Sequence, residues 1–236
     1  MRILTLASVR GAPGVTTTSL LLASAFGDAV VVEADLDGGV LAARYGLGRE
    51  PGLTTFAVSR PQDREGWRAH AQDAGGVPVL VGPDAPGASE SLWRTAGERI
   101  AHNLISAEGI AVVDAGRLGS PIPIVTASDV LAVLVCPVAE QLVALTHILP
   151  TLEHALRGQV AVVLTGDGPY SAADVERFLG MAVLASLPDD RDTARALRDG
   201  GASKSRLARS RLARAVTALA ADVDTLLTGA AEAAAS

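Results

Sequence analysis

The chain is poor in aromatic residues, in cysteine and in long apolar runs, and each scarcity excludes a class of protein. Only 3% of its 236 residues are Phe, Trp or Tyr, too few for a surface that stacks nucleic-acid bases. The single cysteine, Cys136, cannot form an internal disulfide, and its aliphatic surroundings, VLAVLVCP, favour a buried core thiol over a nucleophile. No apolar stretch near the N-terminus is long enough for a signal peptide or a membrane span. We therefore expect a soluble, cytoplasmic protein without an integral membrane segment.

Basic charge is also scarce, whereas aliphatic residues are abundant. The formal net charge of −6 argues against a protein that coats nucleic acid through bulk charge. Hydrophobic residues make up 49% of the chain, so the core must consist mainly of Ala, Val and Leu. Such a core favours helices layered on a parallel sheet, whose central strands are unbroken aliphatic runs. The length of 236 residues fits one large α/β domain.

Short aliphatic runs alternate with longer amphipathic segments, which is the βαβ pattern. We predict a doubly wound, mostly parallel seven-stranded sheet with helices on both faces. The predicted strands are residues 3–8, 29–34, 77–82, 110–114, 130–136, 160–165 and 182–187. The predicted helices are residues 16–26, 90–106, 138–157, 172–179, 190–198 and 206–227. Residues 1–228 are expected to form this single domain, and residues 229–236 a frayed tail.

The most informative segment, SVRGAPGVTTTSLLLASAF, joins the first predicted strand to the first predicted helix. A glycine-rich turn at such a junction points backbone N–H groups and the positive end of the helix dipole at one spot. Gly11 and Gly14 permit the backbone angles and the close approach that a phosphate needs. Thr16 and Thr17 place hydroxyls where a phosphate-bound Mg²⁺ needs one. A plain glycine turn with a threonine N-cap fits the same residues, so the loop alone leaves both interpretations open.

This segment resembles the deviant Walker A loop, K-G-G-x-G-K-T-T, of the MinD/ParA-type ATPases (the SIMIBI class), which include a pilus-assembly CpaE/TadZ-like branch. The family's loop positions are held here, in chain order, by Arg10, Gly11, Ala12, Pro13, Gly14, Val15, Thr16 and Thr17. The resemblance implies that residues 11–17 contact the phosphates of ATP and that Thr16 helps to hold Mg²⁺. It also implies that Arg10 reaches across a dimer to the phosphates bound by the partner chain.

The same alignment shows a degenerate phosphate loop. Val15 stands where the family has its second lysine and cannot neutralise phosphate oxygens, while Pro13 lacks an amide proton. Removing such a group from a transition-state site typically costs about 3–4 kcal/mol. A slow ATPase, a nucleotide binder without turnover and a domain without a ligand are all compatible with that loss.

Two further strand ends resemble the acidic motifs of the family. VVVEADLDGGVLAARYGLGREPGLTTF is similar to the switch I region, in which Glu33 and Asp35 hold the acidic positions of a D-x-D motif. The resemblance implies that Asp35 orients the attacking water and contributes to the metal site, whereas the simpler alternative is that Asp35 or Asp37 caps a turn. GIAVVDAGRLG is similar to the Walker B strand and switch II, which makes Asp114 a ligand of Mg²⁺ through water.

Two later segments correspond to those that border the adenine base in the family. Thr165 ends a predicted strand where relatives carry Asn, which leaves the base specificity open. SLPDDRDTARALRDGG is similar to an I-P-x-D stretch with its trailing helix, so Pro188 and Asp189 are candidate base contacts. A Pro-Asp helix start explains the latter pair equally well.

The basic residues near the C-terminus have three interpretations. The interpretations are a solvated helix face, a nonspecific DNA contact and a membrane-binding helix. The residues include Arg206, Arg209, Arg211 and Arg214. We favour the solvated face, place DNA contact second, and place membrane binding last because no Phe/Trp/Leu-plus-Lys pattern follows.

Three functions remain for the whole chain. The first is an ATP–Mg²⁺ switch with weak or lost hydrolysis. It would form a homodimer, dock a protein partner, and act in division-site placement, chromosome partitioning or the localisation of a pilus or secretion complex. The second is a pseudo-ATPase that serves as a scaffold or regulatory dimerisation module. The third, a dinucleotide enzyme, is disfavoured because the first turn lacks G-x-G-x-x-G.

Overall fold

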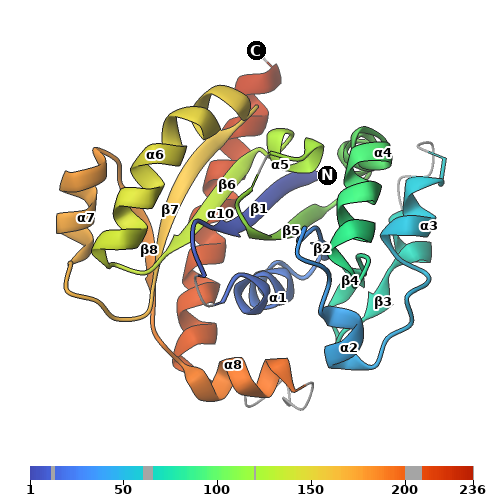
Figure 1. Cartoon of the computed structure of the whole chain (residues 1–236), viewed down its shortest axis with the longest axis horizontal. Coiled ribbons are helices and arrows are strands. Elements are labelled where there is room, and N and C mark those ends of the chain that lie inside the picture. Colours follow the sequence, from blue (N-terminus) through green and yellow to red (C-terminus); the bar gives the residue numbers. More distant parts are fainter. Residues whose placement is uncertain (12–13, 61–65, 120, 200–208, 236) are drawn as a thin grey trace.

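The computed structural model describes residues 1–11, 14–60, 66–119, 121–199 and 209–235 (Figure 1). Its centre is one eight-stranded sheet in the order β3-β4-β2-β5-β1-β6-β7-β8. The strands are β1 Arg2–Ser8, β2 Ala29–Glu33, β3 Gln72–Asp73, β4 Pro78–Leu80, β5 Ile110–Arg117, β6 Val130–Val135, β7 Gln159–Thr165 and β8 Val183–Leu187. Neighbouring strands pair in parallel except for β3 and β4, which are antiparallel.

The predicted doubly wound, mostly parallel sheet is confirmed, and all seven predicted strands are present. The number of strands needs a correction, because β3 adds an eighth at the edge of the sheet. This strand is only two residues long, and both residues, Gln72 and Asp73, are polar. No aliphatic run announces such a strand, so hydrophobic patterning cannot predict it.

Helices follow most of the strands, and the longer ones lie where the sequence predicts them. They are α1 Val15–Phe26, α2 Leu41–Tyr45, α3 Leu53–Ala57, α4 Pro86–Ile105, α5 Pro123–Thr126, α6 Ala139–Ala155, α7 Ala172–Leu179, α8 Arg191–Arg198 and α10 Arg211–Ala235, with a 3₁₀ helix η1 at Gly66–His70. Helix α10 continues to Ala235, into the segment for which a frayed tail is expected. None of the helices in the described ranges is long and apolar enough to span a membrane.

Alternating side chains of the central strands supply two separate apolar layers. In β1, Ile3 and Ala7 face one layer, while Leu4 and Leu6 face the other. The first layer is closed by α3 to α7, and the second by α1, α8 and α10, on opposite sides of the sheet in Figure 1. Because both faces are covered, the central strands are completely buried, which explains their unbroken aliphatic sequences.

Strand β1 lies in the middle of the sheet, between β5 and β6. The chain leaves β1 through α1 toward β2 on one side, and it returns to the other side only with β6, so the winding direction reverses at β1. Open α/β sheets bind ligands outside the carboxyl ends of their strands at such a reversal. The fold therefore directs attention to the loop after β1 and to the strand ends beside it.

Candidate functional site at the carboxyl edge of the sheet

The loop between β1 and α1 ends in a left-handed glycine. Gly14 has φ 107°, a conformation that side chains disfavour, and its carbonyl accepts a hydrogen bond of 2.7 Å from the Thr18 N–H. Gly14 is the N-cap of α1, and among the described residues no side chain caps this end. The threonine N-cap considered for this segment is therefore wrong. The first N–H groups of α1 remain available for an anion. Ala12 and Pro13 lie outside the described residues.

The structure separates the two positions at which the family carries loop lysines. Val15 is only 5% exposed and belongs to the apolar cluster between the sheet, α1 and α10. Arg10 is exposed and makes no ion pair within the described part of the chain. One position is thus part of the core, while the other presents a cation to solvent.

Thr16 of α1 lies close enough to Asp114 of β5 to act on the pKa of its carboxyl group. Asp114 is 1% exposed, and it accepts a hydrogen bond of 3.2 Å from the Gly116 N–H. Burial raises the pKa of Asp114 to about 6, although the Thr16 side chain opposes the shift. The pair resembles the threonine and aspartate that a phosphate-bound Mg²⁺ uses, directly and through water.

Asp35 approaches Asp114 from the end of β2. Its carboxylate accepts a hydrogen bond of 2.9 Å from the Asp37 N–H, as expected for a turn-capping aspartate. It also packs against Gly116, where any side chain would overlap it. Burial raises the pKa of Asp35, and its charge in turn raises the pKa of Asp114, so the two carboxylates lie within electrostatic range.

No three His, Cys, Asp or Glu side chains within the described ranges are close enough to form a metal site by themselves. A divalent cation at Thr16, Asp35 and Asp114 would therefore take further oxygen ligands from phosphate and water. Mg²⁺ commonly binds in this way, through one or two carboxylates and substrate phosphates. The residues present fit such an ion together with a nucleotide.

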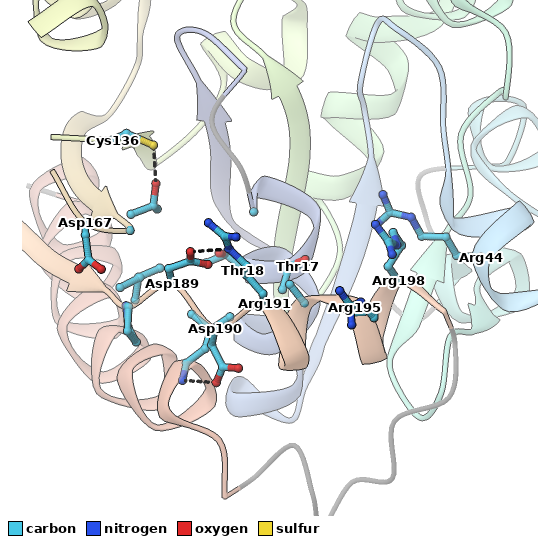
Figure 2. Close-up of a pocket in the computed structure, with 17 residues that line it drawn as sticks. Thr17, Thr18, Arg44, Cys136, Asp167, Asp189, Asp190, Arg191, Arg195 and Arg198 are labelled. Atoms are coloured by element: carbon cyan, nitrogen blue, oxygen red, sulfur yellow. Dashed lines mark hydrogen bonds and ion pairs between the residues drawn. The ribbon is translucent and has the colours of Figure 1, made fainter. Parts of the chain in front are cut away.

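Five of the predicted site residues line one cavity of about 540 Å³ (Figure 2). Gly14 and Thr17 come from the start of α1, Thr165 from the end of β7, and Pro188 and Asp189 from the end of β8. The cavity lies within the range typical of small-molecule sites, about 300–1,000 Å³. Asp35 does not line it. The structure thus gathers the expected phosphate and base contacts in one cavity and places Asp35 beside it.

Asp35 instead lines a second cavity of about 820 Å³ between α4 and the loop after β5. Arg117 and Gly119 of the switch II-like segment line the same cavity, and Trp93 closes it from α4. Asp35 is thus shared between the second cavity, which it lines, and Asp114, whose pKa its charge raises.

The first cavity is also lined by arginines that no sequence motif marks as site residues. They are Arg44 of α2 and three residues of α8, Arg191, Arg195 and Arg198. The spacing of the three on α8 was visible in the sequence, but it is also the spacing of an ordinary solvated helix face. Nothing in the sequence shows that this face is turned toward a cavity.

Solved structures of two kinds share this architecture along nearly the whole chain. MinD, the septum site-determining protein of Pyrococcus horikoshii OT3 complexed with Mg-ADP, superposes with a TM-score of 0.75 at 18% identity, over 95% of this chain and 96% of that one. A ParA family ATPase of Chlorobium tepidum TLS superposes with a TM-score of 0.74 at 16% identity, over 93% and 97%. The chain has the MinD/ParA fold.

The MinD/ParA fold also occurs in the MinC:MinD cell division complex of Aquifex aeolicus, with a TM-score of 0.70 at 14% identity over 95% of this chain and 96% of that one. No protein-family model and no curated protein sequence matches the chain. At these identities the likeness establishes the fold alone.

Of the basic residues near the C-terminus, Arg211 and Arg214 lie in the first turn of α10, and Arg209 just precedes it. Arg209, Arg211 and Arg214 are exposed, and Arg206 lies outside the described residues. Arg211 and Arg214 are three residues apart and share a helix face. This exposure fits both a solvated face and a contact with DNA.

Proposed function

We propose that this chain is a nucleotide-binding switch of the MinD/ParA type that takes ATP with Mg²⁺ at the carboxyl edge of its sheet. The observation that carries the proposal is the proximity of Thr16 to the buried Asp114, at the helix start that follows the left-handed Gly14. A threonine beside a buried aspartate of a neighbouring strand, next to an uncapped helix start, suits a phosphate with its metal ion. The Mg-ADP in the MinD of P. horikoshii, which has the same fold, supports the choice of ligand.

Each candidate residue has a role in this proposal. Residues 11–17, including Ala12 and Pro13, contact the phosphates, and Thr16 and Asp114 hold the metal ion together with Asp35. Asp35 also orients the attacking water, since a carboxylate at this place can polarise a nucleophile. Thr165, Pro188 and Asp189 border the base. Arg10 contacts the phosphates bound by a second copy of the chain.

Hydrolysis is expected to be slow or absent in the proposed switch. Val15 is packed in the core, so no cation occupies the position of the family's second lysine. A charge missing from a phosphoryl-transfer site lowers the rate by about 10²–10³. The chain would then act through the conformations of its bound and free states, in spatial organisation of the kind that division-site, partition or pilus-localising proteins perform, as a homodimer with a protein partner.

A pseudo-ATPase scaffold that binds no nucleotide productively is the second candidate. The buried Val15 and the hydroxyl of Thr165, which stands where the family has an amide, favour this alternative. Contact with DNA through Arg206, Arg209, Arg211 and Arg214 is compatible with either function, although the net charge of −6 favours a local contact over bulk attraction.

Calorimetry with ATP in the presence and absence of Mg²⁺ distinguishes the two functions. The switch is expected to bind ATP more tightly with Mg²⁺, and Asp114→Asn should remove this dependence on Mg²⁺ because it removes the carboxylate. Asp174→Asn, which changes an exposed aspartate of α7, is the matched control. The absence of binding heat at millimolar ATP would exclude the switch and leave the pseudo-ATPase scaffold as the function. Measurable turnover that Asp35→Ala abolishes would instead establish an ATPase.

A further inference from the structure

Helix α8 presents a row of arginines to the first cavity. Arg191, Arg195 and Arg198 are spaced by four and three residues, which places them on one face of the helix, and all three line the cavity. Arg44 of α2 lines it as well. Figure 2 shows Arg44, Arg195 and Arg198 gathered on one side, and we call these three residues the arginine end of the cavity.

Most of the positive charge at the arginine end has no strong partner. Arg198 pairs with the neighbouring Asp199 at 3.2 Å, but both side chains are about 60% exposed, so the pair is weak. Arg44 and Arg195 make no ion pair with any described residue. The sequence GGASKSRLA of residues 200–208 contains no carboxylate that could neutralise them. An anionic ligand group is the natural partner of this cluster.

The carboxylates of the cavity lie at the opposite side. Asp167 follows β7, and Asp189 and Asp190 follow β8, away from the arginine end in Figure 2. Asp189 is already paired with Arg191 at 2.9 Å, and Asp190 accepts a hydrogen bond from the Thr193 N–H at the start of α8. Thr17 and Thr18 of α1 lie between the two sides. The cavity is therefore polarised, with acceptors at the β7 and β8 ends and guanidinium donors at α2 and α8.

A nucleotide has three polar parts: the base, the 5′-phosphates and the ribose hydroxyls. The function proposed above, on which this inference rests, assigns the base to the side of Thr165 and Pro188 and the 5′-phosphates to the loop before α1. The ribose is the part that remains for the arginine end. We propose that the cavity binds a nucleotide that carries a phosphate on a ribose hydroxyl in addition to its 5′-phosphates, and that Arg195 and Arg44 hold this ribose phosphate.

The chemistry of the two arginines suits this assignment. A guanidinium group binds phosphate through two parallel N–H donors, and such charge-assisted hydrogen bonds are stronger than neutral ones. Arginines from two different helices, α2 and α8, would restrict the ribose phosphate to one position. ATP, whose ribose hydroxyls are free, would bind at the same site but leave both side chains unpaired, so a ribose phosphate adds affinity.

Four simple ligands test the proposal by calorimetry with Mg²⁺ present throughout. Adenosine 2′,5′-bisphosphate and adenosine 3′,5′-bisphosphate differ from AMP only by the ribose phosphate, while ADP reports on the nucleotide site itself. One bisphosphate is expected to bind at least about tenfold more tightly than AMP, the effect of one charge-assisted hydrogen bond. Arg195→Ala should remove most of this preference and leave the affinities for AMP and ADP within about twofold.

Two further variants complete the design. Arg44→Ala removes the other arginine from a different helix, so a folding defect of one variant leaves the second to decide. Arg177→Ala, which removes an exposed arginine of α7 that does not line the cavity, should change none of these affinities.

The outcomes distinguish a failure of this inference from a failure of the proposed nucleotide switch. Binding of AMP that equals or exceeds binding of both bisphosphates, while ADP binds, would overturn the inference and keep the nucleotide switch. An equal loss of affinity for ADP and bisphosphate in Arg195→Ala would assign the arginine end to the 5′-phosphates and also overturn it. The absence of binding by all four ligands would overturn the inference and the proposed function together.

Discussion

Val15 begins helix α1 as part of the core. It is 5% exposed and belongs to the apolar cluster that fills the layer between the sheet, α1 and α10. A side chain in this position is selected by packing, because a charged group there would lose its hydration. Packing at the start of α1 therefore disfavours a lysine at position 15, and its absence also removes a cation from the loop.

Val15→Lys is expected to lower the free energy of unfolding by about 2–4 kcal/mol, because the ammonium group must either be buried or pull its stem out of the core. Urea denaturation measures the loss. Val58→Lys is the matched control, since Val58 is 75% exposed and the same substitution should there change stability by less than about 0.5 kcal/mol. Equal midpoints for Val15→Lys and the wild type would show that position 15 opens to solvent. A rise in ATP affinity would show that the loop still fits a lysine.

The ionised carboxylate of Asp114 lowers the stability of the native state. Burial raises its pKa from 3.8 to about 6, so the native state binds a proton more tightly than the unfolded state does. Stability should therefore fall as the pH rises from about 4 through 6, and the penalty of the ionised carboxylate is complete above pH 7. One pKa unit corresponds to about 1.4 kcal/mol, so this penalty is on the order of 2–3 kcal/mol.

Asp114→Asn is accordingly expected to be more stable than the wild type by about 1–3 kcal/mol at pH 7.5 in metal-free buffer. The difference should shrink toward zero at pH 4, where the wild-type carboxyl is protonated in the native state. Urea denaturation of both proteins at the two pH values checks this. A less stable variant at pH 7.5 would mean that the surroundings stabilise the charged carboxylate.

The acidic residue at the end of β2 connects three elements. The carboxylate of Glu33 is buried and accepts hydrogen bonds from the Val40 and Leu41 N–H groups, where α2 starts, and from the Gly82 N–H after β4. Burial raises the pKa of Glu33, while these donors oppose the shift. The segment that carries Asp35 is thereby tied to α2 and to the neighbouring strand.

Glu33→Ala should release this connection, because it leaves three N–H groups, one of them buried and two partly buried, without their acceptor and lowers stability by about 3 kcal/mol. Hydrogen exchange should become faster at Val40, Leu41 and Gly82. Glu33→Gln is the matched comparison. Its single carbonyl oxygen can replace the carboxylate oxygen that serves Val40 and Leu41, so exchange should accelerate mainly at Gly82. Unchanged exchange in Glu33→Ala would show that α2 is held by other contacts.

How far the sequence predicts the elements depends on their length. Residues 172–179 coincide with α7, and each long aliphatic run became a strand, because several periods of a pattern are visible. Helices α2, α3 and α5 are four or five residues long and were missed, since one turn cannot display a helical period. The same limit hid Arg44, which lies on α2.

The residues of the candidate site also differ in how well the sequence predicts their positions. Gly14, Thr17, Thr165, Pro188 and Asp189 meet in one cavity because each follows a parallel strand, and strand ends were predictable. The contacts of Glu33 were not, because its N–H donors come from two separate segments, the start of α2 and Gly82 after β4, which only the fold brings together. The arginine end was missed for a related reason, since α2 and α8 meet through a hydrogen bond from the Tyr45 hydroxyl to the Leu197 carbonyl, 152 residues apart in the chain.

At the scale of the molecule, the arrangement of the two cavities suggests how a second chain would meet this one. Asp35, Arg117 and Gly119 line the second cavity, beside the carboxyl edge that carries the loop and Arg10. Arg10 is exposed and makes no ion pair in the described part of the chain, so its guanidinium group is available to another molecule. A phosphate bound at the same edge of a facing copy is a suitable partner for it.

We therefore expect ATP with Mg²⁺ to shift the chain from its monomer mass of 24.0 kDa to twice that mass in sedimentation velocity. Arg10→Ala should keep the affinity of the monomer for ATP and weaken the dimer by about tenfold or more, because a charge-assisted contact to the facing phosphate is lost. Arg214→Ala, which removes an exposed arginine on α10, should leave the dimer intact. A dimer that forms equally without nucleotide, or that tolerates Arg10→Ala, would place the interface on another face and leave the loop as a site that acts within one chain.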